Sequence, residues 1–330
     1  IFVPCQYWVS AMFTHQISGA TQAVVAGWGN VGGGVTQFFM PLVYSGFKAV
    51  MSEEAAWRSS FIVPAILNFV VGLLIVCLAD DCPQGQYRNL QKGGQMAKNN
   101  PTRAFLEAAS AADSWILFLQ YACCSGVGLT VNNLVASYFY SEFGLSLVSA
   151  GSVASSFFLM NLFARAVGGM LSDFAFKRIY FGTHPLNSRI LVQGLILLFE
   201  GIMIFTFSRC KTLGTAIFVL LLFSLGVQAG SGSTMALVPY VKGPVTGSVA
   251  GIVGAGGNVG AMCWGFMFLL GPDRPQDCLV IISLIVVAST VSSFFLKFSD
   301  AKVQLKENDK QNDDMVEAPV EAPTMTDSAR

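Results

Sequence analysis

Residues 26–34 read Ala-Gly-Trp-Gly-Asn-Val-Gly-Gly-Gly, and residues 254–261 read Gly-Ala-Gly-Gly-Asn-Val-Gly-Ala. The shared Gly-Asn-Val-Gly begins at Gly29 and begins again at Gly257, 228 residues later. Each copy lies inside a long apolar stretch. We call these two segments the glycine-asparagine clusters, and their similarity indicates an internal repeat.

The composition around the clusters excludes most soluble classes. Of 330 residues, 53% are hydrophobic and 12% are charged, whereas an average soluble domain has about 25% charged residues. A chain with so few charges cannot cover a surface that faces water, so we expect it to lie in a lipid bilayer. The formal net charge is zero, without the clustered basic residues that a nucleic-acid partner requires.

Apolar runs long enough to cross a bilayer, which takes about 20 residues each, predict an all-α polytopic membrane protein. Eight complete spans are expected at roughly 20–45, 57–79, 113–138, 146–171, 189–208, 212–238, 247–270 and 276–297. The apolar stretch Ile1 to Phe13 lacks the basic region of a signal peptide. We therefore interpret it as the end of a further span that is preceded by more sequence.

A second match supports the repeat, because the tripeptide that begins at Ser18 aligns with one that begins at Thr246 at the same spacing. Span 247–270 is the fifth of the late group of spans. Span 20–45 should then be the fifth of the early group, which predicts twelve spans in a complete protein. Transporters commonly contain such repeats, with the substrate site near the bilayer midplane.

The sequence divides into four segments. Residues 1–79 are expected to be the remainder of an N-terminal helical bundle, 80–112 a central loop rich in proline, glycine and basic residues, and 113–297 a C-terminal bundle. Residues 298–330 are polar without apolar periodicity, as in a disordered tail.

Lysine and arginine are unequally distributed between alternate loops. Thirteen lie on the side of the central loop and the C-terminus, and five on the other side. Because cytoplasmic loops collect basic residues, the central loop and the tail are predicted to be cytoplasmic. This count leaves Arg165 as the one basic residue within a span.

Arg165 is the strongest candidate for a binding residue, since an arginine at the bilayer centre costs roughly 3 kcal/mol even on the lenient insertion scale. One interpretation is a structural ion pair, for which the mid-span acid is Glu200. The other is that its planar fork of donors binds an anion. The second interpretation predicts an anionic substrate.

The glycine-asparagine clusters also have two interpretations. Small residues allow close helix packing in membranes. Alternatively, they form the wall of a pocket for a small ligand, with both asparagines facing inward because lipid-facing amides are costly. The candidate residues are Asn30, Asn258, Gly29, Gly32, Gly256 and Gly257.

Two further features are weaker candidates. Tyr121 could turn its hydroxyl into a cavity or could be ordinary core packing. The segment with Asp173, Lys177 and Arg178 ends a span with an acid followed by two bases, and we expect a conformational latch of ion pairs between helices. The eight cysteines lie mostly in apolar runs. No phosphate loop, metal-ligand cluster or nucleophile elbow is present, so we expect no enzyme activity, no cofactor and no metal.

These motifs resemble the nitrate/nitrite porter family of the major facilitator superfamily. Residues 26–34 look like the first nitrate signature of that family, on its fifth helix, and residues 254–261 look like the second, on its eleventh. The segment from Asp173 to Arg178 is similar to the superfamily's loop motif between helices eight and nine. Cys5-Gln6-Tyr7-Trp8 looks like the eukaryotic branch.

The resemblance implies a twelve-helix transporter that holds nitrate between an arginine of helix two and an arginine of helix eight. Arg165 matches the second arginine, and the first would precede this sequence. The family's asparagine of helix five corresponds to Asn30, its tyrosine of helix seven to Tyr121, and an aromatic residue of helix four to Phe2.

The expected function is transport of nitrate, and of nitrite, across the plasma membrane by alternating access, coupled to protons. An accessory membrane protein is a possible partner, and a nucleic acid is not. A facilitator or exchanger of another small inorganic anion would share the same charge clamp. A sensor that binds nitrate without moving it is the alternative from another class.

Overall fold

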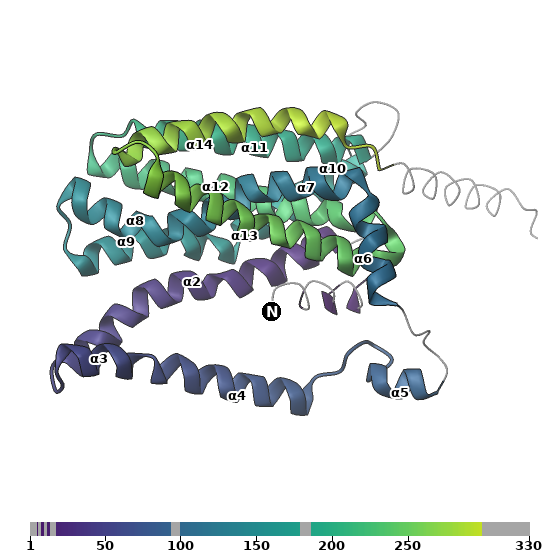
Figure 1. The fold of residues 1–330 in the computed structure, drawn as a ribbon, viewed down its shortest axis with the longest axis horizontal. Coiled ribbons are helices and arrows are strands. Elements are labelled where there is room, and N and C mark those ends of the chain that lie inside the picture. Colours follow the sequence, from purple (N-terminus) through teal and green to yellow (C-terminus); the bar gives the residue numbers. More distant parts are fainter. Residues whose placement is uncertain are drawn as a thin grey trace, which may run out of the picture.

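The computed structural model describes residues 5, 8, 9, 12, 13, 18–93, 100–178 and 186–298. This part of the chain folds into helices (Figure 1), and outside them it contains one isolated bridge between Cys82 and Gly85. The α-helices are α2 (Ser18–Lys48), α3 (Glu53–Ser60), α4 (Ile62–Leu78), α5 (Tyr87–Lys92), α6 (Pro101–Ser110), α7 (Ala112–Tyr121), α8 (Val127–Phe143), α9 (Leu147–Leu159), α10 (Ala164–Arg178), α11 (Leu186–Ser208), α12 (Leu213–Leu237), α13 (Thr246–Leu270) and α14 (Pro275–Ser289).

Seven helical segments of the described residues are long and apolar enough to cross a membrane. They are Glu53–Leu78, Ala112–Phe143, Val148–Arg178, Leu186–Ser208, Leu213–Tyr240, Thr246–Leu270 and Pro275–Phe295. The prediction of an all-α polytopic membrane protein is confirmed. The expected span 20–45 forms the 31-residue helix α2 but is not among the seven.

Two of the spans contain an irregular turn near their middle. A π-helical turn, Ala122–Gly126, joins α7 to α8. A 3₁₀ turn, Met160–Leu162, ends α9, and Phe163 leaves the helical conformation with φ −132° before α10 begins. Such interruptions within a helix often mark functional sites.

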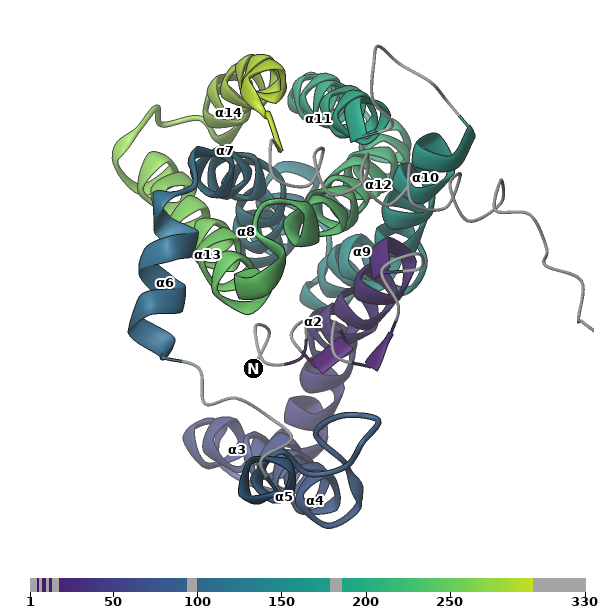
Figure 2. The ribbon, with the colours of Figure 1, turned by 90° about the vertical axis from the view of Figure 1, so that its right-hand side faces the viewer.

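Helix α12 lies at the centre of the bundle. It packs against α10 and α11 and also contacts α2, and Figure 2 shows α11 on one side of it and α9 and α2 on the other. Every residue from Gly226 to Leu237 is buried. The glycines and serines in this stretch allow neighbouring backbones to approach closely, which replaces the hydrophobic driving force that lipid removes.

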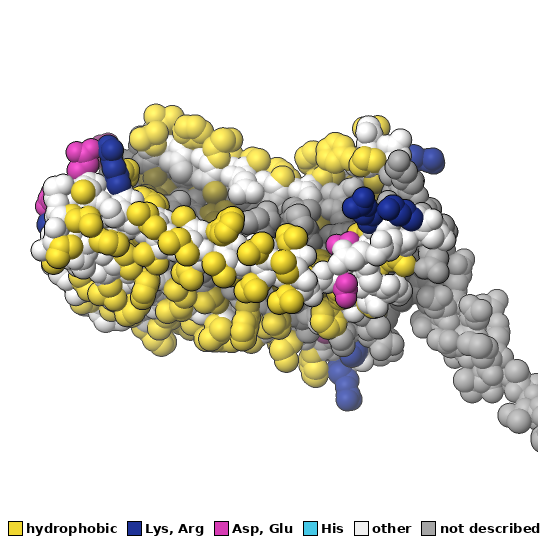
Figure 3. Space-filling view, turned by 90° about the horizontal axis from the view of Figure 1, so that it is seen from below, with side chains coloured by type: hydrophobic (Ala, Val, Ile, Leu, Met, Phe, Trp, Pro, Cys, Tyr) yellow, Lys and Arg dark blue, Asp and Glu magenta, His cyan; other side chains and the backbone are white. Residues whose placement is uncertain are grey.

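Helix α4 stands away from the bundle together with α3 (Figures 1 and 2). None of its residues is buried among the described residues. Hydrophobic side chains cover the long face in Figure 3, and charged side chains gather at its two ends. This distribution suits a segment surrounded by lipid, because a helix satisfies its own backbone groups there.

The expected central loop 80–112 contains two short helices, α5 and α6. Asn100 caps α6, because its side-chain oxygen accepts hydrogen bonds from the backbone N–H groups of Thr102 and Arg103. An asparagine followed by Pro101 is a helix-start signal. The expected disordered tail lies outside the described residues apart from Phe298.

Candidate functional site

Arg165 is the second residue of α10 and lies three residues after the end of the 3₁₀ turn that precedes this helix. Its side chain is buried, with 2% of its surface exposed. Nη2 donates a hydrogen bond to the hydroxyl oxygen of Tyr121 at 3.2 Å, and Nη1 donates to the backbone carbonyl of Ala26 at 3.4 Å. No ion pair joins Arg165 to Glu200 among the described residues.

Tyr121 is the last residue of α7 and is followed directly by the π-helical turn. The ring is buried. The carbonyl of Ala122, the first residue of this turn, accepts a hydrogen bond from the indole N–H of Trp264 at 2.9 Å. Helix α13 therefore holds the turn that carries Tyr121, and Tyr121 holds Arg165.

The two glycine-asparagine clusters reach opposite sides of the Arg165–Tyr121 pair. A Cβ atom added to Gly257 of α13 would lie 3.0 Å from the Tyr121 ring, and one added to Gly27 of α2 would lie 3.3 Å from Cβ of Arg165. A Cβ at Gly27 would also lie 2.5 Å from the backbone oxygen of Asn161, which excludes a side chain there, and one at Gly257 would require the Tyr121 ring to shift. The repeat identified in the sequence brings its two copies to one pair of polar residues.

The other candidates from the clusters do not all gather at this pair. Asn30 is half-buried and donates to the Ala26 carbonyl of its own helix at 2.8 Å. Gly29 and Gly32 face open space, since a Cβ atom added to either would meet no described atom within 4 Å. Asn258 is exposed among the described residues, whereas the glycines next to it form the buried face of α13.

Gly256 has a packing role, since a Cβ there would lie 2.3 Å from the carbonyl oxygen of Phe118. The close-packing interpretation of the clusters is therefore correct for this position. Phe2, the remaining candidate, lies outside the described residues.

Helix α12 contributes glycines that the sequence interpretation overlooked. A Cβ at Gly232 would lie 2.1 Å from the backbone oxygen of Arg165, and Gly168 of α10 meets Ala229 in the same way at 2.0 Å. The run of small residues that predicts this contact is visible in the sequence at residues 226–234, Gly-Val-Gln-Ala-Gly-Ser-Gly-Ser-Thr. A small-residue run of this kind inside an apolar span indicates close helix approach.

The segment around Asp173 forms an ion pair with a helix that was not predicted as its partner. Nη1 of Arg189, in α11, lies 2.7 Å from a carboxylate oxygen of Asp173 and donates to the Ser172 hydroxyl at 3.0 Å. The guanidinium also lies 4.6 Å from the ring centre of Phe176 and donates to the Tyr240 hydroxyl at 3.3 Å.

Two sequence predictions change as a result. Lys177 and Arg178 are exposed at the end of α10, and neither forms an ion pair among the described residues. The count of basic residues assigned Arg189 to a loop, whereas the structure buries it in the first turn of α11. Arg189 is 1% exposed and lies within the candidate membrane span Leu186–Ser208, because four partners compensate its burial.

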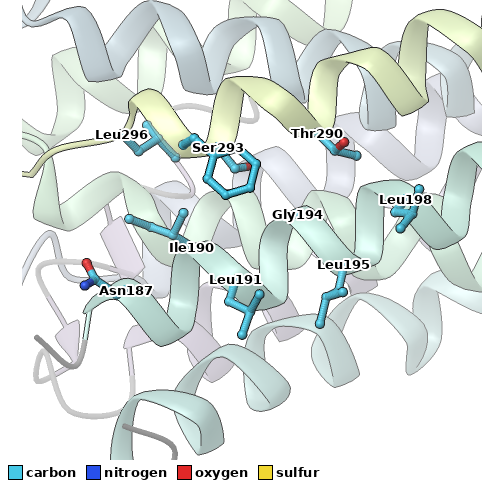
Figure 4. A pocket seen from close by; sticks show the side chains of 10 residues that line it. Asn187, Ile190, Leu191, Gly194, Leu195, Leu198, Thr290, Ser293 and Leu296 are labelled. Atoms are coloured by element: carbon cyan, nitrogen blue, oxygen red, sulfur yellow. The ribbon is translucent and has the colours of Figure 1, made fainter. Parts of the chain in front are cut away.

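Two cavities in the described structure lie away from Arg165. One, of about 440 Å³, is open to the side between α11 and the turn that follows α14 (Figure 4), and it is lined mainly by leucine, isoleucine and phenylalanine. The other, of about 150 Å³, lies between α8 and α13–α14. Neither lining contains a charged side chain, so neither suits an inorganic anion. The described residues also contain no cluster of metal-ligating side chains.

A helical bundle with seven apolar membrane-length segments and a buried arginine near an irregular turn defines a polytopic membrane protein. The chain belongs to the Major Facilitator Superfamily, whose family profile matches residues 1–265.

Curated relatives support the narrower resemblance to the nitrate/nitrite porters. The chain is 35% identical to the high affinity nitrate transporter 2.5 of Arabidopsis thaliana, over 84% of this chain and 54% of the relative. It is 38% identical to nitrate transporter 2.2 of Chlamydomonas reinhardtii, over 90% of this chain and 59% of the relative. It is also 35% identical to the nitrate/nitrite transporter NrtP of a Picosynechococcus strain, over 47% of this chain and 28% of the relative. The chain thus spans a little over half the length of the first two relatives.

Proposed function

We propose that the protein containing this chain transports nitrate, and nitrite, across a membrane by alternating access. The observation that carries this proposal is the buried Arg165, held by Tyr121 between the two glycine-asparagine clusters. The relatives, which are named as nitrate transporters or nitrate/nitrite transporters, support nitrate as the anion.

The chemistry of the pair suits a small planar anion. A guanidinium presents several N–H donors in one plane and remains charged, so it can bind two oxygens of nitrate or nitrite at once. The Tyr121 hydroxyl accepts a hydrogen bond from Arg165, and a phenolic hydroxyl can act as donor as well as acceptor. The tyrosine therefore orients the guanidinium of Arg165.

The open side of α2 would form another part of the pocket. Gly29 and Gly32 leave space beside the half-buried Asn30, whose amide could approach a ligand of few atoms. The second arginine implied by the family resemblance would come from a segment that this sequence does not include. Asn258, on the exposed side of α13, would contribute only if the complete protein covers that face.

The transport cycle is proposed to be coupled to protons and to take place at the plasma membrane, with the C-terminus in the cytoplasm. The distribution of basic residues supports this orientation. The segments 1–79 and 113–297 would rock against each other, with 80–112 as the cytoplasmic connection. The conformational latch would be the ion pair between Asp173 and Arg189, not an ion pair made by Lys177 or Arg178. We also propose an accessory membrane protein as a partner of the transporter.

The test uses the full-length protein in liposomes and measures uptake of isotopically labelled nitrate. Arg165→Lys should lower uptake from low nitrate concentrations by about tenfold or more, because a point charge loses the two-donor fork, a difference of about 1.5–3 kcal/mol. Arg58→Lys, at an exposed arginine of α3, is the control. Wild-type rates in Arg165→Lys would contradict the assigned site.

Competition by other anions separates the proposed function from its alternatives. A nitrate transporter should be inhibited by nitrite more strongly than by chloride or phosphate, with and without a pH gradient. Saturable binding without uptake by the wild type would instead identify a sensor.

A further inference from the structure

A second ionisable residue lies buried in the spans and has no role in the site described above. Glu200 lies more than two turns from either end of α11 and has none of its surface exposed. Neither carboxyl oxygen has a hydrogen-bond partner among the described residues. A polar group so deeply buried and unpartnered requires an explanation.

The surroundings of Glu200 supply little that could stabilise a negative charge. Helix α12 faces it with glycine: a Cβ on Gly226 would lie 3.0 Å from Cα of Glu200, and one on Gly230 would lie 3.2 Å from a carboxyl oxygen. On the π-helical turn, Cys123 and Cys124 are the titratable groups within electrostatic reach. The adjoining surface of α14 meets Gly201 of α11 with Val287 and the Ser283 backbone.

No cation on these packed elements forms an ion pair with Glu200 in the described structure. An ionised carboxylate in such an environment is strongly disfavoured, so the carboxyl group holds a proton while the helices are packed. Separation of α11 from α12 would admit water and allow the proton to leave. Such a site would be a neutral acid when closed and a carboxylate when hydrated.

Glu200 and Arg165 lie against the same glycine-rich stretch of α12. Gly230 meets the carboxyl group of Glu200, and two residues later Gly232 meets the backbone of Arg165. Cys124 also connects the two residues. It lies within electrostatic reach of Glu200, and its sulfur lies 3.8 Å from the carbonyl oxygen of Tyr121, the residue that holds Arg165. A movement of α12 or of the π-helical turn that admits water to one residue therefore displaces the other.

We propose that Glu200 is the proton-binding site that couples proton movement to movement of the anion held by Arg165. This inference rests on the proposed function. Glu200 takes up one proton from the water on one side of the membrane, crosses the occluded state as the neutral acid, and releases that proton to water on the other side. The carboxyl group changes charge by one unit and no bond other than O–H forms or breaks.

The test compares Glu200→Gln with wild type in the full-length protein reconstituted in liposomes. Glutamine keeps the shape and cannot exchange a proton. Nitrate-for-nitrate exchange at equal pH should stay within about twofold of wild type, whereas accumulation driven by a pH gradient should fall by about tenfold or more. Glu142→Gln, at an exposed acid of α8, should leave both rates unchanged.

Two results would overturn the inference. Glu200→Gln could accumulate nitrate in response to a pH gradient like the wild type, or both Glu200→Gln and Glu200→Asp could lose exchange together with accumulation, which would indicate a structural role. A second readout does not depend on transport. The infrared band of a protonated buried carboxyl group, obtained as wild type minus Glu200→Gln, should be present and should decrease with rising pH.

These readouts separate failure of the inference from failure of the proposed function. If wild-type liposomes do not exchange nitrate, the proposed substrate is wrong, yet the infrared titration still tests whether Glu200 binds a proton. If exchange occurs but the infrared band is absent, nitrate transport stands and Glu200 is not the proton site.

Discussion

The guanidinium of Arg165 donates a hydrogen bond to the hydroxyl of Tyr121, with 3.2 Å between Nη2 and the hydroxyl oxygen. Each residue adjoins an irregular turn: the π-helical turn follows Tyr121, and a 3₁₀ turn with the non-helical Phe163 precedes Arg165. Regular helices at these points would direct both side chains elsewhere. The geometry of the pair therefore depends on two local departures from the α-helix.

Removal of the tyrosine hydroxyl should weaken anion transport without unfolding the protein. Tyr121→Phe keeps the ring that packs against Gly257 but removes the group that orients Arg165. We expect the nitrate concentration for half-maximal uptake to rise by about three- to tenfold, the effect of one hydrogen bond. Tyr140→Phe, at an exposed tyrosine of α8, is the matched control, and an equal effect of both substitutions would contradict the role of Tyr121.

A methyl group at Gly232 should displace the backbone that carries Arg165. The added Cβ would lie 2.1 Å from the Arg165 carbonyl oxygen, whereas a Cβ at Gly29 meets no described atom within 4 Å. Gly232→Ala should therefore destabilise the protein by about 1–3 kcal/mol, as overpacking does, and should lower the melting temperature in detergent. Gly29→Ala should leave it unchanged; the same loss in both variants would refute the contact assignment.

The ion pair between Asp173 and Arg189 should stabilise the contact between α10 and α11. Asp173→Asn leaves the buried Arg189 without its 2.7 Å carboxylate partner, at a cost of about 3–5 kcal/mol for a broken buried pair. The melting temperature should drop clearly. Lys177→Gln, at the exposed end of α10, should melt like wild type. If Lys177 formed the latch instead, Lys177→Gln would lower the melting temperature more than Asp173→Asn.

The indole of Trp264 should stabilise the π-helical turn. Trp264→Phe removes the buried hydrogen bond from the indole to the Ala122 carbonyl, a loss of about 0.5–1.5 kcal/mol. Both stability and nitrate affinity should fall, because the turn positions Tyr121. Trp115→Phe also removes an indole hydrogen bond, to the Ala109 carbonyl, but at an exposed position, and should have a smaller effect on both measurements.

The spans could be predicted from the sequence because their cause is local. Each helix that crosses lipid satisfies its own backbone groups and needs a run of apolar side chains, so hydropathy locates the helices in the chain. Arg165 could be identified for the same reason, since a charge within such a run is costly wherever the helix packs. The repeat of the glycine-asparagine clusters was likewise visible in the residues themselves.

The direction in which each side chain points was decided by the tertiary structure. In a lipid-exposed helix both faces are apolar, so no periodic pattern tells the buried face from the exposed one. The sequence therefore could not show that Asn258 lies on the exposed side of α13 in the described structure while Gly257 is buried. Glycines of similar appearance also differ, since Gly27 admits the backbone of another helix while Gly29 meets open space.

The sequence by itself thus determined the membrane class, the repeat and the presence of an arginine that needs a partner. Only the tertiary structure showed that Tyr121 orients Arg165, that Asp173 pairs with Arg189, and that Glu200 lies against glycines of α12. The physical reason is that each of these contacts joins residues from different helices. Their distances depend on how closely the backbones pack, which no single span encodes.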